Sequence, residues 1–427
     1  MHIVLIAPSW KSVSGPTTKS LFPPLSLAVV AALTPRKHTV RIIDESVEDI
    51  DPELEADLVG ITCLTAVAPR AYEIADSFRS RGVPVVLGGM HPSALPEEAA
   101  RHADCVVVGE AEGVWEEVLK DIEAGRAKKI YRSPERPSLA GLPIPRRDLF
   151  DPRKYYTTST IQTSRGCPYA CSFCSVTRFF GRTYRTRPIA DILREIETLK
   201  DRMVLFVDDN IVGNPAHARE LFRALIPYRL RWIGQSSINI AWDQELLALA
   251  AKSGCIGLFI GFESLAAENL KKVGKGLLNR VDRFFKAIKR IHSHGIGIEG
   301  AFIFGFDQDD EGVFARTVEF AKRARLAAAQ FGILTPFPGT PLFADLDSQG
   351  RIVDKSWSRY TISNAVFEPL KMSREKLEQG FRWAYREFYS YRSIFRRLLP
   401  FKRHLPFFLA LNISFRRIAL QPRYGER

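Results

Sequence analysis

Ser164-Arg-Gly-Cys-Pro-Tyr-Ala-Cys-Ser-Phe-Cys174 is the stretch of sequence that decides the fold and the chemistry of this chain. It places Cys167, Cys171 and Cys174 in a C-x3-C-x2-C spacing, so three thiolates converge on one soft metal centre. A zinc site would normally add a fourth Cys or His at short spacing, and the residues from Ser175 to Gly181 contain neither. The spacing therefore favours an iron–sulfur cluster with one open iron, and a structural metal knuckle is the alternative.

The stretch resembles the signature of the radical S-adenosylmethionine (SAM) enzymes, including the aromatic Phe173 before the last cysteine and the strand-like Thr160–Thr163 ahead of the first. The resemblance implies that Cys167, Cys171 and Cys174 hold a 4Fe–4S cluster whose open iron binds the methionine end of SAM. The reduced cluster would cleave SAM to a 5′-deoxyadenosyl radical. A flavodoxin-like or ferredoxin-like electron donor is implied as a partner.

Composition places the chain among soluble globular proteins, with 427 residues, 46% hydrophobic and 26% charged residues. No apolar run reaches about 18 residues, and Met1–Ala7 is a strand-like segment without the features of a signal peptide. Cys63, Cys105 and Cys255 are predicted to be core thiols, which indicates a reducing, cytoplasmic compartment. The net charge of +13 favours anionic partners. We do not expect a nucleic-acid partner.

Residues 1–131 are predicted to form a doubly wound, Rossmann-like α/β domain, because short apolar runs alternate with helix-like segments. The strand candidates are Ile3–Ala7, Thr39–Ile43, Leu58–Thr62, Val83–Leu87 and Cys105–Val108. The helix candidates are Leu25–Leu33, Ala66–Arg81, Pro96–His102 and Val114–Ala124. Such sheets bind ligands at the carboxyl ends of their strands, here in loops that include Pro8–Phe22.

This arrangement resembles the cobalamin-binding domain that precedes the radical SAM domain in one large subclass of those enzymes. The resemblance implies cobalamin contacts at Thr62, Leu64, Thr65, Gly88, Gly89, His91, Gly109 and Glu110. The D-x-H-x-x-G motif that supplies a histidine to cobalt in many cobalamin proteins is absent. His91 is either a substitute ligand or a structural residue, and a domain that binds nothing is the alternative for the whole region.

Residues 132–155 are rich in proline and are predicted to be an extended linker. Residues 156–345 then alternate strands and helices in six units, which predicts a partial (β/α)6 TIM-like barrel. The strand candidates are Thr160–Ser164, Met203–Val207, Arg231–Ser236, Cys255–Gly261, Ile298–Phe304 and Gln330–Leu334. The helix candidates are Ile189–Lys200, Pro215–Ile226, Gln244–Ser253, Val281–His294 and Glu311–Ala324.

Polar side chains follow the predicted strands of this barrel, at the end where such barrels carry their active sites. By the resemblance, Phe173 would lie near the adenine of SAM. Asp208, Asp209 and Asn210 would meet its methionine amino group, and Gln235, Ser237 and Glu263 its ribose or carboxylate. Asp, Ser and Asn after a strand are also common helix caps, which is the structural alternative for these positions.

Residues 346–427 are predicted to be helical. Leu377, Phe381, Ala384, Phe388 and Tyr391 recur at three- and four-residue steps after Ser373, a plausible N-cap. We expect this helix to fold over the barrel mouth.

The tail, residues 401–427, is apolar between Leu405 and Phe415 and has basic flanks at Lys402, Arg403, Arg416 and Arg417. This pattern is typical of peripheral contact with an anionic surface such as the inner membrane, or of an ordinary docking helix.

The resemblance covers roughly residues 1–345, and the layout also resembles that of the hopanoid C-2 methylases. It implies a cobalamin-dependent radical SAM enzyme that methylates an unactivated carbon of a hydrophobic or lipid-like substrate, using a 5′-deoxyadenosyl radical and methylcobalamin. A radical cyclase, rearrangement or oxidative enzyme without methyl transfer is the second hypothesis. The third is a non-catalytic iron–sulfur electron-relay protein.

Overall fold

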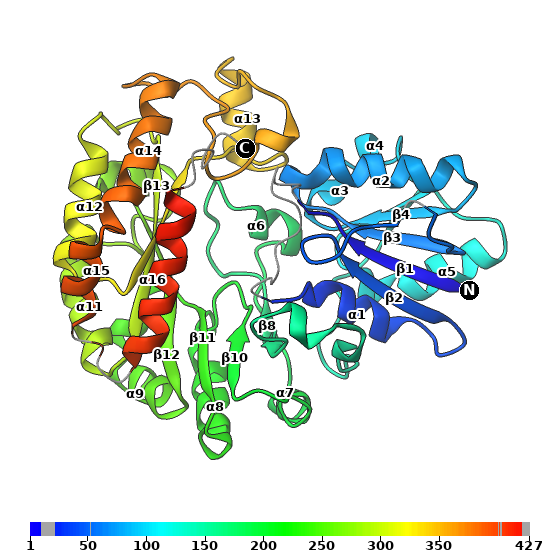
Figure 1. Cartoon of the computed structure of the whole chain (residues 1–427), viewed down its shortest axis with the longest axis horizontal. Coiled ribbons are helices and arrows are strands. Elements are labelled where there is room, and N and C mark those ends of the chain that lie inside the picture. Colours follow the sequence, from blue (N-terminus) through cyan, green and yellow to red (C-terminus); the bar gives the residue numbers. More distant parts are fainter. Residues whose placement is uncertain (10–21, 52, 400, 402–403, 421–427) are drawn as a thin grey trace. The chain divides into compact units, whose positions relative to one another are not determined.

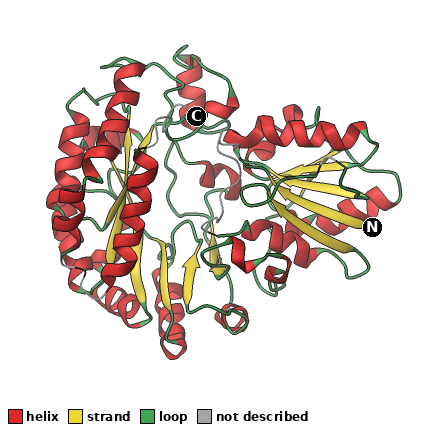
Figure 2. Ribbon diagram, viewed as in Figure 1, coloured by secondary structure: helices red, strands yellow, loops and turns green. Residues whose placement is uncertain are grey.

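The computed structural model describes residues 1–9, 22–51, 53–399, 401 and 404–420, and within them strands and helices alternate (Figures 1 and 2). Contacts divide the chain into two compact units. Unit 1 comprises Met1–Ile161, Ser175–Gly181 and Ala190–Asp201, and unit 2 comprises Gln162–Cys174, Arg182–Ile189 and Arg202–Arg427. Most of the predicted loop Pro8–Phe22, together with Lys402 and Arg403, lies outside the described residues.

Unit 1 is built on a sheet of six parallel strands in the order β2-β1-β3-β4-β5-β6. Its strands are β1 (His2–Ala7), β2 (Thr39–Asp44), β3 (Leu58–Thr62), β4 (Val85–Gly88), β5 (Cys105–Val108) and β6 (Ile130–Arg132). Its helices include α1 (Leu25–Leu33), α2 (Ala68–Ser80), α3 (Met90–Ala94), α4 (Pro96–Ala99), α5 (Trp115–Glu123), α6 (Ser175–Phe180) and α7 (Ile189–Ile196). Figure 1 shows α1 and α5 on one face of the sheet and α2 on the other. The predicted doubly wound domain is confirmed, with a sixth strand, β6, and a short helix, α3, that the sequence did not predict.

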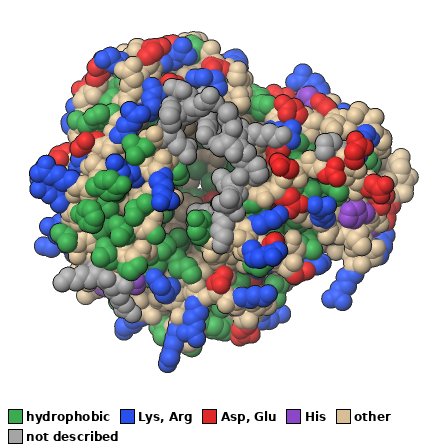
Figure 3. All heavy atoms as spheres, in the orientation of Figure 1, with side chains coloured by type: hydrophobic (Ala, Val, Ile, Leu, Met, Phe, Trp, Pro, Cys, Tyr) green, Lys and Arg blue, Asp and Glu red, His purple; other side chains and the backbone are tan. Residues whose placement is uncertain are grey.

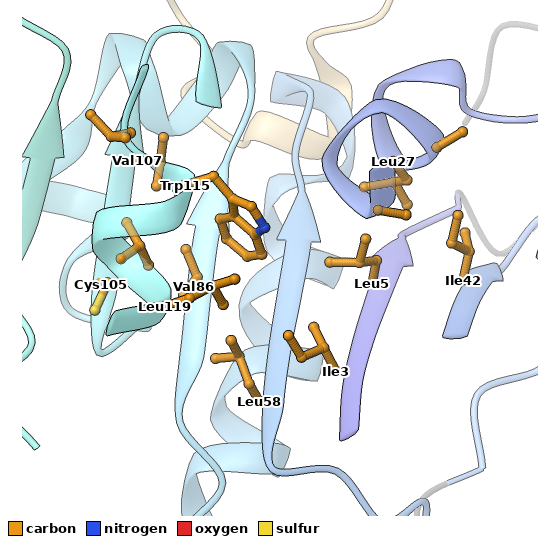
Figure 4. Close-up of a cluster of buried hydrophobic side chains, with 14 of the residues drawn as sticks. Ile3, Leu5, Leu27, Ile42, Leu58, Val86, Cys105, Val107, Trp115 and Leu119 are labelled. Carbon is orange, nitrogen blue, oxygen red and sulfur yellow. The ribbon is translucent and has the colours of Figure 1, made fainter. Parts of the chain in front are cut away.

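The core of unit 1 lies between the sheet and the helices α1 and α5. Figure 4 shows Trp115 directed toward the strands, near Leu5 and Leu27. The indole Nε1 of Trp115 donates a hydrogen bond of 2.9 Å to Thr34 Oγ1, so the polar atom of this buried ring is satisfied. Cys105 belongs to the same core, and the thiols of Cys63 and Cys255 are also buried, as predicted.

The proline-rich segment 132–155 packs with unit 1. Phe150 and Tyr155 are buried in the core of that unit. The Tyr155 hydroxyl donates a hydrogen bond of 3.2 Å to Asp44 Oδ2 at the end of β2. The predicted linker contains two short 3-10 helices, Arg147–Leu149 and Pro152–Lys154, and two aromatic side chains anchor it to the N-terminal unit.

The second sheet has six strands in the order β14-β13-β12-β11-β10-β7, and the pairs from β10 to β14 are parallel. Its strands are β7 (Thr160–Ile161), β10 (Met203–Phe206), β11 (Arg231–Gln235), β12 (Cys255–Glu263), β13 (Gly297–Phe304) and β14 (Ala328–Ile333). Its helices include α8 (Pro215–Leu225), α9 (Gln244–Lys252), α10 (Ala267–Lys272), α11 (Phe284–Ser293), α12 (Val313–Arg323) and α13 (Pro341–Ser348). A separate two-stranded ribbon pairs β8 (Ser164–Arg165) with β9 (Arg185–Thr186). The order confirms the predicted partial barrel, which ends at β7 and β14.

Aromatic rings fill the layer between this sheet and its outer helices. Phe262 of β12 stacks on Phe302 of β13 with ring centroids 5.4 Å apart, and it meets Phe284 of α11 edge-on at 5.0 Å. Phe320 of α12 closes the group. Offset and edge-on pairs add about 0.5–1.5 kcal/mol each to the burial of the rings. This layer fixes the carboxyl ends of β12 and β13, where polar groups were predicted.

Glu299 of β13 lies on the opposite, inner face of the sheet. Along the strand, half-buried Glu299 and Ile303 alternate with the fully buried Phe302 and Phe304 of the aromatic layer. Burial raises the pKa of the Glu299 carboxyl to about 7. The barrel interior thus contains an acid that titrates near neutral pH.

Replacing Glu299 with glutamine is expected to stabilise the protein above neutral pH. The unfolded chain releases the Glu299 proton near its ordinary pKa of 4.5 and the folded chain near 7, so the free energy of unfolding falls as pH rises between these values. The loss should reach about 3 kcal/mol, because one pKa unit corresponds to ~1.36 kcal/mol. Urea unfolding at pH 4 and pH 8 checks this: the advantage of E299Q should be present at pH 8 and absent at pH 4. An equal effect at both pH values would contradict it.

Helix α14 (Arg374–Phe388) covers the free edge of β14. Leu377 near its start and Phe367 before it lie beside Gly305, which follows β13. The Tyr385 hydroxyl accepts a hydrogen bond from the backbone N–H of Phe331 and donates one to its carbonyl, at 3.2 and 3.0 Å. The Tyr389 hydroxyl does the same for Ala329, at 3.1 and 2.7 Å. Two tyrosines therefore supply the hydrogen bonds that a further strand would make.

The apolar stripe of α14 ends at Phe388, and Ser373 caps the helix as predicted, accepting from the N–H of Lys376. Ser390 caps the next helix, α15 (Tyr391–Leu398), so Tyr391 begins a new element and is 59% exposed instead of continuing the stripe. The periodic pattern predicted one helix because two helices follow each other with almost no spacing.

The tail forms helix α16 (Leu405–Ala419), which packs within unit 2 through its buried residues Phe408, Asn412 and Ala419. Phe408 lies against Gly297 and Gly257, and Asn412 is fully buried. The Asn412 carboxamide accepts a 2.8 Å hydrogen bond from Arg397 Nη2 of α15 and donates one of 2.8 Å to the Ala327 carbonyl. This is the docking-helix alternative for the tail. Within the described ranges, no helix is long and apolar enough to cross a membrane.

Candidate functional site

The cysteine loop, residues 166–174, follows β8 at the carboxyl end of the unit 2 sheet. Cys167, Cys171 and Cys174 are half-buried and form no disulfide. The Ser172 N–H donates to the Val273 carbonyl at 3.2 Å, and the Ser172 carbonyl accepts from the Leu342 N–H at 3.0 Å. Backbone contacts on both sides thus hold the three thiols in one rigid loop.

Two aspartates at the end of β10 fix the start of this loop. The Asp208 carboxylate is fully buried and accepts hydrogen bonds from the Thr163 N–H, at 3.0 Å, and from the hydroxyls of Thr163 and Ser164. The Asp209 carboxylate accepts from the Gly166 N–H at 3.0 Å. Burial raises the pKa of Asp209 to about 6.

The Asp208 carboxylate holds the loop that carries the cysteines through these hydrogen bonds. The predicted SAM contacts of Asp208 and Asn210 remain predictions. Asn210 is also buried, and its Oδ1 accepts from the Ser237 N–H at 3.0 Å, which ties the end of β10 to the end of β11. Asp209, which is half-buried, stays a candidate for the amino group.

Three other predicted SAM residues lie at the same end of the sheet. Gln235 ends β11 with an exposed side chain, Ser237 follows it, and Phe173 is half-buried within the cysteine loop. These positions leave all three side chains available to a ligand, and their predicted contacts remain predictions.

Glu263 ends β12 beside the cysteines, and its partner is a lysine that the sequence did not reveal. The Lys275 ammonium pairs with Glu263 Oε1 and donates a 3.2 Å hydrogen bond to the Gly261 carbonyl. Glu263 adopts a left-handed backbone conformation with φ of 66°, which is uncommon outside glycine and is typical of functional sites. A side chain at Gly261 would collide with both charged groups, so this glycine makes room for the pair.

The Glu263–Lys275 pair is almost buried, with side chains 9% and 13% exposed. Burial opposes the charged form of Lys275, but Glu263 and Cys171 outweigh it, so the pKa of this lysine is raised above its ordinary value. One positive and one negative group are therefore held beside the thiols. No sequence motif marks Lys275; the only signal was its position in a loop close to Glu263.

The thiols fit an iron–sulfur cluster by their chemistry. Burial raises the pKa of Cys171 to about 11; Lys275 opposes the rise, and Cys174, Glu263 and Cys167 add to it. The raised pKa means that the free thiolate is disfavoured at this site. Bound iron would offset this, because iron stabilises thiolates. Among the described residues, no three Cys, His, Asp or Glu side chains converge as ligands of one metal ion. A 4Fe–4S cluster does not require the three thiols to meet at one point, because each cysteine binds a different iron.

The loops predicted to hold cobalamin gather at the carboxyl edge of the unit 1 sheet. The N–H of Cys63 donates to the Gly88 carbonyl at 2.9 Å, which joins the loops after β3 and β4. The Ser93 hydroxyl accepts from the Gly109 N–H and donates to the Gly89 carbonyl, at 2.8 and 2.7 Å, which joins the loops after β4 and β5. The edge is thus one connected surface.

Glycine is required at two positions on this edge. Gly89 has a φ of 101°, and a Cβ there would lie 2.9 Å from the backbone of Cys63. Gly109 has a φ of 85° with nothing within 4 Å of its Cβ position, so an open space lies above it. Leu64 is 59% exposed beside them, whereas Thr65 and Glu110 are buried and Thr62 is half-buried. Bare backbone and an exposed leucine fit a large, flat ligand.

His91 does not face this open edge. Its ring is fully buried, with Nδ1 3.3 Å from Thr65 Oγ1 and Nε2 3.2 Å from Glu98 Oε1. Both nitrogens are engaged inside the domain, as the structural alternative predicts. The role of His91 toward cobalt remains a prediction.

Comparison with known proteins agrees with both halves of this description. Residues 12–119 match the B12 binding domain family, and residues 161–321 match the radical SAM superfamily. The bacteriochlorophyllide d C-12(1)-methyltransferase of Chlorobaculum tepidum is 36% identical over 88% of this chain and 84% of its own. The hopanoid C-2 methylase of Rhodopseudomonas palustris is 27% identical over 78% and 66%.

Among solved structures, the chain is similar in fold to the radical S-adenosylmethionine methyltransferase TsrM from Kitasatospora setae, determined with cobalamin and a [4Fe–4S] cluster bound. The TM-score is 0.68 at 20% sequence identity, over 91% of this chain and 85% of that one. The likeness extends over both units.

Proposed function

The chain belongs to the cobalamin-dependent radical SAM methyltransferase family, and from this we propose that it methylates an unactivated carbon of a hydrophobic substrate. The observation that carries the proposal is the presence, in one chain, of a three-cysteine loop and of an open glycine edge on a B12-binding fold. The cofactors of this family are a 4Fe–4S cluster, SAM and cobalamin, as predicted from the sequence. When bound, they supply a radical that removes hydrogen and a methyl group that replaces it.

The residues of unit 2 would bind and orient SAM. Cys167, Cys171 and Cys174 would hold the cluster. Glu263 and Lys275 present opposite charges beside it, and the methionine end of SAM carries an amino group and a carboxylate. A buried charge is costly unless it has a partner of opposite charge. When SAM binds, its amino group can pair with Glu263 and its carboxylate with Lys275, so each buried charge keeps a partner. Gln235, Ser237 and Phe173 remain available for the ribose and adenine.

The hydrophobic substrate is inferred from the relatives. Their names give a bacteriochlorophyllide and a hopanoid as substrates. A hydrophobic substrate of the present chain would be held chiefly by apolar burial, with few polar contacts to fix its orientation.

The products formed from SAM test the proposal. Anaerobic, cluster-loaded protein given SAM, cobalamin, a reductant and candidate lipids should form both 5′-deoxyadenosine and S-adenosylhomocysteine. Gly88→Leu should keep 5′-deoxyadenosine formation and lose cobalamin retention and S-adenosylhomocysteine, because Gly88 ends β4 at the edge proposed to hold cobalamin and a bulky side chain there would block close approach of a ligand to the backbone. Gly88→Ala is the matched control and should retain cobalamin.

Other product patterns would select the alternatives. 5′-Deoxyadenosine alone, from a protein that binds no cobalamin, would favour cyclisation, rearrangement or oxidation. No SAM cleavage under strong reduction would favour an electron-relay protein.

A further inference from the structure

Helix α15 exposes a row of large apolar side chains. Tyr391 and Phe395 of α15 and Leu399, its C-cap, follow one another at four-residue steps and are 59%, 63% and 68% exposed. Four-residue steps place side chains on one face of a helix. The row is therefore an apolar stripe directed to solvent. The solvent-facing side of a packed helix is normally polar, so an exposed apolar stripe indicates an interaction surface.

The other face of α15 is fixed to unit 2. Ile394 and Leu398 are buried. The buried Arg397 donates to the Leu326 carbonyl at 2.6 Å and to Asn412 of α16 at 2.8 Å. Because α15 is held from within by these contacts, its exposed stripe is a preformed surface.

The segment that carries the stripe is strongly basic. Residues 391–420 contain seven Lys and Arg residues and no Asp or Glu. Arg392 and Arg396 are exposed on α15 next to the stripe, and Arg417 is exposed on α16. Figure 3 shows hydrophobic side chains gathered over α15 and α16, with lysine and arginine side chains among them.

We propose that this face of α15 docks on the surface of an anionic phospholipid bilayer. Aromatic and leucine side chains enter the boundary between headgroups and acyl chains, and arginines bind the phosphates just outside it. Both features occur here within one helix. The arginines of α15 complement the negative charge of an anionic membrane surface, and the nearest carboxylate along the chain, Glu387 of α14, pairs with Lys322.

Docking on a bilayer would allow the protein to take a hydrophobic substrate from the membrane, and in that respect the inference rests on the proposed function. Its test reads membrane binding alone, so methyl transfer can fail without affecting it. The docking residues tested are those of α15, because α16 is tied to unit 2 through Phe408 and Asn412. Point variants are therefore preferable to removing the tail, which would uncover the partners of Phe408 and Asn412.

Co-sedimentation of the full-length protein with vesicles tests the inference. The protein should sediment at low salt with vesicles of phosphatidylcholine and phosphatidylglycerol, leave them at high salt, and ignore pure phosphatidylcholine. Phe395→Asp, and separately Arg392→Glu with Arg396→Glu, should each lower the partition coefficient about tenfold or more. Circular dichroism should show unchanged helix content in both variants.

Two controls match these changes elsewhere on the surface. Leu277 is fully exposed, so Leu277→Asp alters exposed apolar area without touching α15. Arg36→Glu with Arg132→Glu makes the same change in net charge at exposed positions of unit 1. Both controls should bind vesicles like the unaltered protein. The inference is overturned if the unaltered protein stays in the supernatant, if the controls lose as much binding as the α15 variants, or if Phe395→Asp instead disperses a dimer of this chain.

Discussion

Replacing Cys171 with alanine is expected to abolish cleavage of SAM. The cysteine loop offers three thiols, so the variant leaves one iron of the cluster without its cysteine ligand. The reconstituted variant should lose the absorbance of the 4Fe–4S cluster, and 5′-deoxyadenosine should fall to background. Iron, sulfide and product analyses measure the three effects together.

Cys255→Ala is the matched control for this loss. Cys255 is also a free thiol, but it is buried at the start of β12 and belongs to the apolar core. Its removal should cost some stability and leave iron content and SAM cleavage intact. A Cys171→Ala protein that cleaved SAM at the normal rate would refute the assignment of the cluster to this loop.

Replacing Lys275 with methionine is the second change expected to have a large effect. It leaves Glu263 nearly buried without its cation, and breaking a buried ion pair from one side costs about 3–5 kcal/mol. Binding of SAM should weaken by about a hundredfold or more, since one charged partner of its methionine end is lost and the other is displaced. Equilibrium binding of SAM to the cluster-loaded protein gives the affinity, and urea unfolding gives the stability.

A double variant separates the two effects. Glu263→Gln combined with Lys275→Met removes both charges and should recover most of the lost stability, but not the affinity for SAM. Lys272→Met is the control, because Lys272 lies three residues away and pairs with Asp307 at the more exposed surface. If the double variant binds SAM normally, the pair is purely structural.

Local sequence predicted what depends on local spacing. The cysteine loop could be recognised because its three ligands lie within eight residues. The strands could be recognised because buried parallel strands are continuous apolar runs, and helix α1 begins and ends where the sequence predicts. These features need no knowledge of which segments meet in space.

Features that depend on tertiary contacts were missed or left open. A carboxylate after a strand can bind a ligand or the chain itself, and Asp208 binds the chain because Thr163 and Ser164 lie beside it in the fold. Lys275 could not be recognised, because it meets Glu263 only after helix α10 has formed between them. His91 was ambiguous for the same reason: Glu98 engages its ring only after the chain has folded.

The tyrosine cover over β14 also has a consequence for how the protein is made. Tyr385 and Tyr389 lie 54 and 60 residues after the strand positions that they bond. The ribosome adds about 5–20 residues per second, so Tyr385 and Tyr389 are synthesised roughly 3–12 seconds after the residues of β14 that they bond. During synthesis the barrel therefore passes through a stage with an open strand edge, and chains that terminate before Tyr385 should retain this edge and associate through it. Tyr385 of α14 and Tyr389 after it therefore protect the edge of β14 from pairing with other chains once they have been synthesised.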